Sequence, residues 1–177
     1  MIQAVGPLMR ERVGATVTGE VNHAQLGLIV RGKGSVPTRA NGQRHAPAAR
    51  FLPGDWMQAN WSQGLGQFDL VLSNPPYVED AADLAPSVRA HEPAQALFSG
   101  PDGLDDYRVL VPQIPALLEE NGIALIEIGW TQAAAVSALA QGAGMSAKVH
   151  RDLALRERAV EMAKNRNIPL GKASPAL

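Results

Sequence analysis

The feature that most constrains the fold is an apolar run that two prolines bring to a stop. Residues 68–73 read FDLVLS, and residues 74–80 continue NPPYVED. A near-continuous apolar run is typical of a strand covered on both faces, in the middle of a parallel sheet. Proline has no N–H for a ladder hydrogen bond, so the strand must end at the proline pair. We therefore expect a buried strand over 68–73 with an irregular loop at its carboxyl end.

The second half of the chain alternates helical and strand patterns. Apolar residues recur at three and four over 103–121, which predicts a helix with acidic residues in its first turn and a kink or break at Pro112 and Pro115. Asn121-Gly122 predicts the helix stop. The apolar run IALIEIG at 123–129 predicts a second buried strand.

The pattern after residue 129 predicts one more helix and a pair of strands. Thr131 is expected to cap an alanine-rich helix that ends in glycines. Residues 147–154 and 158–163, separated by a charged turn, predict a terminal antiparallel pair. From Lys164 onwards the sequence predicts an irregular tail.

The amino-terminal third is less regular. It predicts short strands at 14–19 and 48–53 and a short helix within 35–47. Alternating strands and helices followed by two strands are typical of an α/β three-layer domain with a mostly parallel sheet and an antiparallel edge hairpin. In such sheets ligands bind beyond the carboxyl ends of the central strands, where the Asn-Pro-Pro-Tyr loop falls.

Composition bounds the possible functions. With 177 residues, 46% of them hydrophobic, the chain has the length of one globular domain. The formal net charge is −1, divided into +4 for residues 1–60 and −5 for residues 61–177, which is far below a dedicated nucleic-acid-binding arm. The sequence contains no cysteine, which excludes disulfides, thiolate catalysis and cysteine-type zinc sites.

The sequence also lacks the signals of membrane insertion, secretion and metal binding. No apolar stretch approaches the roughly 20 residues that span a bilayer, and the amino terminus lacks the basic-then-apolar order of a secretory signal. The four histidines show no ligand spacing such as H-x-x-x-H, so no metal site is predicted. We expect an unprocessed cytoplasmic protein.

The loop of Asn74, Pro75, Pro76 and Tyr77 has the chemistry of a site for a planar amine or amide. The prolines fix the backbone and leave carbonyls with no neighbouring N–H to compete for them. Asn74 adds a side-chain oxygen, and Tyr77 adds a flat ring with a polar tip. A planar NH2 group can donate one hydrogen to the Asn74 side chain and one to the Pro75 carbonyl, which aligns its nitrogen with an electrophile. The alternative is a strand that merely ends at a proline-rich turn.

Several spaced blocks resemble a known family. DLVLSNPPYVED resembles the (D/N/S)-P-P-(Y/F) signature of amino-methylating S-adenosylmethionine-dependent methyltransferases. The stretches HEPAQALFSGPDGLDDYR at 91–108, LIEIGWTQ at 125–132 and RDLALRERAVEM at 151–162 are similar to one branch, the peptide-chain release factor glutamine-N5 methyltransferases. The resemblance covers about residues 36–163.

This resemblance implies a fold, a cofactor and a substrate. The fold would be a Rossmann-like class I methyltransferase domain, the cofactor S-adenosylmethionine, and the substrate the glutamine of the Gly-Gly-Gln motif in class I release factors. Carried over to this sequence, Asn74 and Pro75 would hold the glutamine amide, Pro76 would stiffen the loop, and Tyr77 would line the pocket.

The expected cofactor residues form an incomplete set. Asp55 and Trp56, in PGDW, resemble the family's block at the adenine of the cofactor, and Asn74 would also border the cofactor. The family's Gly-x-Gly-x-Gly loop is absent. GATVTG resembles the family's second strand, which ends in an acidic residue that binds the ribose hydroxyls, and Glu20 stands at about that place.

The resemblance implies that the methyltransferase domain spans residues 1–163, of which 1–35 are atypical and 36–163 family-like, followed by the irregular tail at 164–177. The chain resembles the carboxyl-terminal part of a longer enzyme, without its helical amino-terminal domain. Without the first strand the sheet would lose its central member, so we expect weak cofactor binding and marginal stability.

Two other functions remain open. A nucleic-acid adenine-N6 methyltransferase would use the same amide clamp, formed by the Asn74 side-chain oxygen and the Pro75 carbonyl, on an exocyclic amine. The acidic second half and the 5% aromatic content disfavour this function. A non-catalytic remnant that at most binds a partner is favoured by the missing glycine loop.

Smaller motifs carry less information. Residues 27–35, GLIVRGKGS, nearly spell a phosphate-binding loop but lack its hydroxyl at the required position, so a flexible basic loop is predicted. Glu127 lies in an apolar strand and needs a partner if it points inward. The remaining acidic residues of interest are expected to order the structure or to complement a helix dipole: Glu92, Asp102, Asp105 and Asp106.

Overall fold

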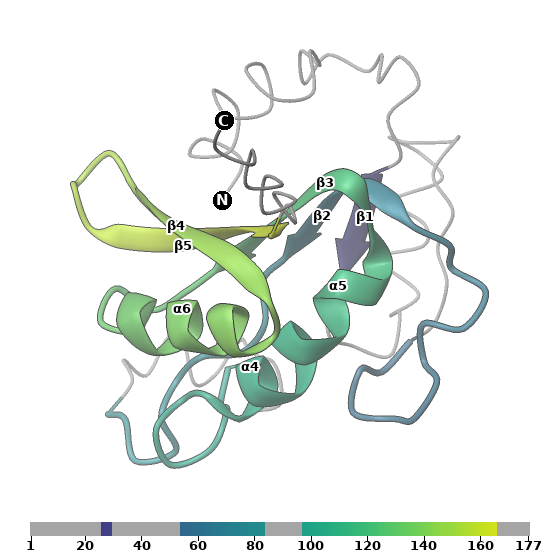
Figure 1. Cartoon of the computed structure of the whole chain (residues 1–177). Helices are drawn as coiled ribbons and strands as arrows, with labels where there is room; N and C mark the ends of the chain where they lie inside the picture. Colours follow the sequence, from purple (N-terminus) through teal and green to yellow (C-terminus); the bar gives the residue numbers. More distant parts are fainter. Residues whose placement is uncertain (1–25, 30–53, 84–96, 166–177) are drawn as a thin grey trace, which may run out of the picture.

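The computed structural model describes residues 26–29, 54–83 and 97–165 (Figure 1). The elements predicted at 14–19, 35–47 and 48–53 lie outside the described residues, as does the tail from residue 166.

A five-stranded sheet forms the centre of the described part. Its order is β1-β2-β3-β5-β4. The strands are β1 (Leu26–Ile29), β2 (Phe68–Ser73), β3 (Leu118–Glu127), β4 (Met145–Arg151) and β5 (Glu157–Lys164). β2 is parallel to both β1 and β3, whereas β5 pairs antiparallel with β3 and β4. The predicted mostly parallel sheet with a terminal antiparallel pair is therefore confirmed.

β2 coincides with the strand predicted from the apolar run. It lies between two parallel neighbours, and Leu70 and Val71 at its centre are buried. The chain leaves regular structure directly after Ser73, as the proline pair requires.

β1 corrects the first part of the flexible loop predicted over 27–35, whereas residues 30–35 lie outside the described residues. Residues 26–29 pair with β2 from Leu26 opposite Leu70 to Ile29 opposite Ser73. β2 thus has a parallel neighbour on the side where we expected the sheet to lose a member. A strand of four residues is too short to show a periodicity of its own, so only its pairing with β2 identifies it.

The helical pattern over 103–121 is divided into three pieces. They are α4 (Asp105–Leu110), a 3-10 turn, η2 (Val111–Gln113), and α5 (Ile114–Leu117). The predicted break is confirmed, because Pro112 and Pro115 lie in the first turns of η2 and α5, where proline's missing N–H is tolerated. The predicted stop at Asn121-Gly122 is wrong. The chain becomes extended at Leu118 (φ −98°, ψ 138°), which pairs with Phe68.

The last helix, α6 (Ala133–Gly142), begins one residue later than predicted. Its N-cap is Gln132, and Thr131 is an exposed turn residue, so the predicted Thr131 cap is wrong. The predicted glycine end is confirmed, because Gly142 closes the helix and Gly144 follows with φ +76°.

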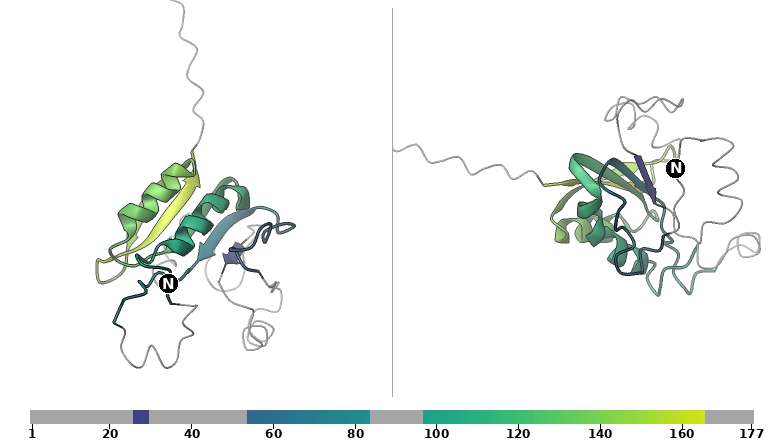
Figure 2. Two further views of the ribbon diagram at one scale, coloured as in Figure 1. Left: turned by 90° about the horizontal axis from the view of Figure 1, so that it is seen from below. Right: turned by 90° about the vertical axis from the view of Figure 1, so that its right-hand side faces the viewer.

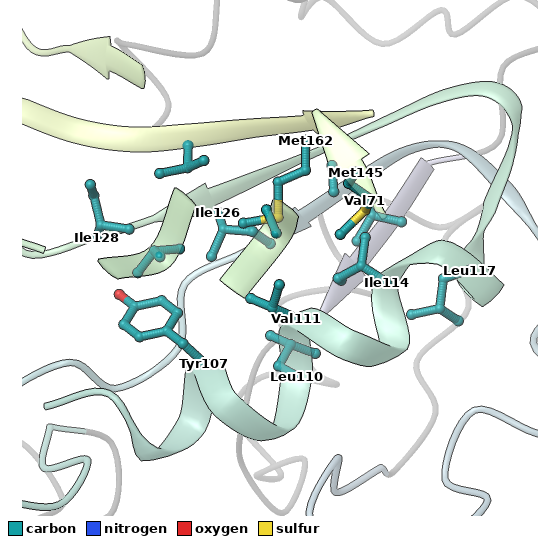
Figure 3. Close-up of a cluster of buried hydrophobic side chains, with 14 of the residues drawn as sticks. Val71, Tyr107, Leu110, Val111, Ile114, Leu117, Ile126, Ile128, Met145 and Met162 are labelled. Atoms are coloured by element: carbon teal, nitrogen blue, oxygen red, sulfur yellow. The ribbon is translucent and has the colours of Figure 1, made fainter. Parts of the chain in front are cut away.

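The main core lies between the sheet and the described helices. α4, α5 and α6 lie on the same face of the sheet, and α6 runs beside the α4–α5 segment (Figure 1, Figure 2). Side chains of α4 to α5 point toward the sheet (Figure 3). The buried residues labelled there are Val71, Tyr107, Leu110, Val111, Ile114, Leu117, Ile126, Ile128, Met145 and Met162. Burying one such aliphatic side chain contributes about 1.5–3 kcal/mol.

The opposite face of the sheet carries a smaller apolar group. Leu125 and Ala159 are buried there, with Leu72 packed against them. Within the described residues helices cover one face only, so the third layer stays a prediction. No helix in this part of the chain has the length and apolar character to cross a membrane.

Candidate active site

The candidate site lies at the carboxyl end of β2. Ser73 pairs with Ile29 of β1 and Ile126 of β3, so the carboxyl ends of these three strands lie at one level of the sheet. Asn74 is exposed, whereas Pro75 and Pro76 are buried. The proline pair therefore fixes the loop in the protein while Asn74 stays exposed to solvent.

Tyr77 turns back toward the end of β3. Its hydroxyl lies 3.5 Å from Oε1 of Glu127, to which it donates a long hydrogen bond. Its ring lies against Gly129, where an added Cβ would come within 3.5 Å of Cδ2. Burial, and next the charge of Glu127, raise the pKa of Tyr77, so its phenol stays neutral. Glu127 thus has the partner that its place in an apolar strand requires.

A second tyrosine lies beneath this pair. Tyr107 of α4 is fully buried, and its hydroxyl donates to the backbone oxygen of Glu127 at 2.8 Å. Burial raises the pKa of Tyr107, and the neighbouring Tyr77 and Glu127 raise it further. The sequence marked Tyr107 only as an apolar helix position and gave no signal of its contact with Glu127.

Gln132 connects three loops at this edge of the sheet. Its side-chain oxygen accepts from the N–H of Gly129 at 3.0 Å. Its side-chain nitrogen donates to the carbonyls of Tyr77 and Gly103, at 3.1 and 3.2 Å. Sequence analysis missed this role, because the two carbonyls are 55 and 29 residues away along the chain.

A short parallel contact fixes the loop further along. The N–H of Val78 donates to the carbonyl of Leu97 at 2.8 Å, and the N–H of Ser99 donates to the carbonyl of Val78 at 2.9 Å. The N–H of Asp80 donates to the carbonyl of Gly100 at 3.0 Å. The residues after the proline pair are therefore held by backbone hydrogen bonds to segment 97–100.

Asp55 and Trp56, predicted at the cofactor, differ in accessibility. Asp55 is half-buried, and its Oδ1 accepts from the N–H of Met57 at 3.0 Å, which closes a turn. Trp56 is 2% exposed, and its indole N–H donates to Oδ1 of Asp106 at 3.0 Å. A ring this deeply buried has little surface for a ligand. Trp56 instead anchors the Asp55 turn to the core through its hydrogen bond to Asp106.

The acidic residues near α4 divide into two groups. Asp102 and Asp105 are exposed around Arg108, whose guanidinium holds the pKa of Asp102 below its usual range. Asp106 is buried and accepts from Trp56 and, at 2.8 Å, from the hydroxyl of Ser99. A helix-dipole role alone, as predicted, therefore does not describe Asp106.

The predicted site residues within the described part fall into two connected groups. Asn74, Pro75, Pro76 and Tyr77 form the loop after β2, and Asp55 with Trp56 joins the Asp106–Ser99 pair beside segment 97–100. Glu20 and Glu92 lie outside the described residues. Among the residues that are described, no group of three or more acidic or histidine side chains is placed to hold a metal ion.

Sequence comparison finds similar curated proteins. No family model matches the chain. The release factor glutamine methyltransferase of Caulobacter vibrioides is 45% identical over 114 residues, which are 62% of this chain and 39% of that protein. The matched part of the chain is thus similar in sequence to a release factor glutamine methyltransferase. The Rhodospirillum rubrum protein of the same name is 42% identical over 113 residues, 62% of this chain and 34% of that protein. The chain thus spans less than half the length of these curated relatives.

A solved structure supports the fold alone. Streptomyces venezuelae DesVI superposes with a TM-score of 0.54 at 12% identity, covering 92% of this chain and 90% of that one. Together with the order of the sheet, this match confirms the predicted Rossmann-like α/β fold.

Proposed function

We propose that this chain provides the catalytic part of a protein-(glutamine-N5) methyltransferase. It would transfer a methyl group from S-adenosylmethionine to the side-chain amide of the glutamine in the Gly-Gly-Gln motif of a class I release factor. The observation that carries the proposal is the exposed Asn74 amide beside a buried proline pair, at the carboxyl end of a central parallel strand. The names of the relatives support the choice of substrate.

The loop residues hold the substrate amide. The side-chain oxygen of Asn74 and the carbonyl of Pro75 accept the two hydrogens of the glutamine NH2, which fixes the plane of the amide. Pro76 stiffens the loop, and Tyr77 lines the pocket as a neutral ring. A neutral phenol adds no charge beside the reacting nitrogen, and its hydroxyl remains committed to Glu127.

The cofactor supplies an electrophilic methyl group when bound. Of the predicted cofactor residues that the structure describes, Asp55 is half-buried and Asn74 exposed, so both would contact the cofactor, and Glu20 remains a predicted contact with the ribose. Trp56 would act indirectly by holding the Asp55 turn against Asp106. The bond from the amide nitrogen to the methyl carbon would form as the bond from that carbon to the cofactor sulfur breaks, with S-adenosylhomocysteine as the leaving group. The nitrogen would then release one proton to water, so the chain needs no strong base for the step.

The partner and the compartment follow from the same proposal. The substrate would be a folded release factor that presents its glutamine to the edge of the sheet, and the site of action would be the cytoplasm. The same clamp fits an exocyclic base amine, so an adenine-containing oligonucleotide is the comparison substrate.

Asn74→Ala tests the proposal, with Asn121→Ala as a matched control at another exposed asparagine. We expect saturable binding of S-adenosylmethionine by the unmodified chain and methylation of the release factor but not of the oligonucleotide. In Asn74→Ala the turnover should fall on the order of 10²-fold, by more than any loss of cofactor affinity. Methylation of the oligonucleotide instead, or equal turnover in Asn74→Ala, would overturn the proposal. A folded chain that binds no cofactor would favour the alternative of a non-catalytic remnant of the fold.

A further inference from the structure

We infer that Gln132 is a positioning residue that holds the amide clamp in place by tying its loop to two others. The inference rests on the proposed function, and it concerns a residue that does not itself touch the substrate. Gln132 is 8% exposed and lies at the N-cap of α6.

The orientation of the Gln132 amide is fixed by its partners. The N–H of Gly129 can only donate, so it faces the side-chain oxygen of Gln132, at 3.0 Å. The carbonyls of Tyr77 and Gly103 can only accept, so both lie against the side-chain nitrogen. All three bonds agree with a single orientation of the amide.

Two glycines, Gly103 and Gly129, pack closely against the Gln132 side chain. At Gly103, which has φ +69°, an added Cβ would lie 2.4 Å from the Tyr77 oxygen and 2.7 Å from the Gln132 side-chain nitrogen. At Gly129 an added Cβ would lie 2.8 Å from the Gln132 side-chain oxygen. Bare glycine backbone on two sides therefore lets the three loops approach one amide group.

The position of these bonds gives Gln132 its effect on the clamp. Pro75 and Pro76 have no N–H, so hydrogen bonds can hold this part of the loop only through its carbonyls or from Tyr77 onwards. The Tyr77 carbonyl follows the Pro75 carbonyl by two residues and is bound directly by Gln132. Moving the Tyr77 backbone therefore moves the acceptor that aligns the substrate nitrogen, and a displacement of about 1 Å can cost on the order of 10²-fold in rate.

Gln132→Glu tests the hydrogen bonds most directly. It keeps the shape of the side chain and the oxygen that accepts from Gly129, but it replaces the NH2 group with a second carboxylate oxygen, which faces two carbonyl oxygens. Gln141→Glu is the matched control, since Gln141 is an exposed residue of the same helix. Gln132→Met removes the hydrogen bonds without adding charge, and it shows whether the charge alone disturbs the fold.

The first measurement is turnover and cofactor affinity against pH, with the release factor as methyl acceptor. In Gln132→Glu we expect turnover to fall on the order of 10²-fold at pH 8, with cofactor affinity changed less than about threefold. A buried carboxyl facing carbonyls has a raised pKa, so lower pH restores one donor and part of the turnover. Gln141→Glu should match the unmodified chain at every pH. Equal turnover in both variants would overturn the inference.

The second measurement is hydrogen exchange in residues 73–83, and it needs no activity. Loss of the Gln132 bonds should speed exchange of the Val78 and Asp80 amides at least tenfold in Gln132→Glu and Gln132→Met, while exchange in β2 and β3 stays unchanged. Exchange equal to that of Gln141→Glu would refute the positioning role. An unmodified chain without methyl transfer would count against the proposed function, and the exchange result would still decide the role of Gln132.

Discussion

Trp56→Phe tests how the predicted cofactor side of the site is held. The substitution keeps an aromatic ring in the core but removes the indole N–H that donates to Asp106 at 3.0 Å. A hydrogen bond to a charged group contributes about 1.5–3 kcal/mol, and the smaller ring leaves a cavity that costs about 1 kcal/mol more. We therefore expect the free energy of unfolding to fall by about 3 kcal/mol, a large share of the 5–15 kcal/mol typical of native proteins.

Urea unfolding followed by circular dichroism measures this loss. Trp130→Phe is the matched control, because Trp130 is 62% exposed and undergoes the same chemical change. The control should change the free energy of unfolding by less than about 0.5 kcal/mol. A thermal scan should show a melting temperature about 6–12 °C lower for Trp56→Phe.

A double-mutant cycle with Asp106→Ala separates the hydrogen bond from the cavity. The coupling energy between positions 56 and 106 should be about 1–3 kcal/mol. A coupling energy near zero, or a loss in Trp56→Phe no larger than in Trp130→Phe, would show that the bond between Trp56 and Asp106 does not stabilise the fold.

Three further predictions concern the loops and α4. Burial raises the pKa of Tyr77 and Tyr107 above 10.0, the value in the unfolded chain. Above pH 10 the unfolded chain therefore releases phenolic protons that the folded chain keeps. The contribution of the two tyrosines to the free energy of unfolding is thus fully present below pH 10 and falls as pH rises further. Tyr107→Phe should reduce that alkaline loss by up to about 1.4 kcal/mol per pH unit in urea unfolding; an unchanged slope would contradict this. Gly103→Ala should destabilise the chain by at least about 1 kcal/mol, because Gly103 has φ +69° and an added Cβ would lie 2.4 Å from the Tyr77 oxygen. A melting temperature equal to that of the unmodified chain would disprove the close approach. Arg108→Ala removes two exposed ion pairs, with Asp102 and Asp105, and should leave the melting temperature unchanged, because exposed ion pairs stabilise proteins little; a lower melting temperature would show that these pairs matter for the fold.

The sequence predicts elements whose signals are local. The strand over 68–73, the break at Pro112 and Pro115 and the glycine end of α6 each follow from residue types within the segment itself. The site was located for the same reason, since a proline pair directly after a buried strand marks its carboxyl end.

What the sequence missed depends on partners far along the chain. β1 has four residues and is identified only by pairing with β2. The helix ends at Leu117 because Leu118 pairs with Phe68, which a local stop signal does not show. The bonds of Gln132 to Tyr77 and Gly103 join residues that a periodicity cannot relate.

The most direct test of the central proposal is mass spectrometry of a class I release factor after incubation with the purified 177-residue chain and S-adenosylmethionine. We expect one added methyl group, on the glutamine of the Gly-Gly-Gln motif, and none on a release factor with that glutamine replaced by alanine. An unmodified release factor after incubation with a folded chain, or a methyl group on another residue, would contradict the proposal.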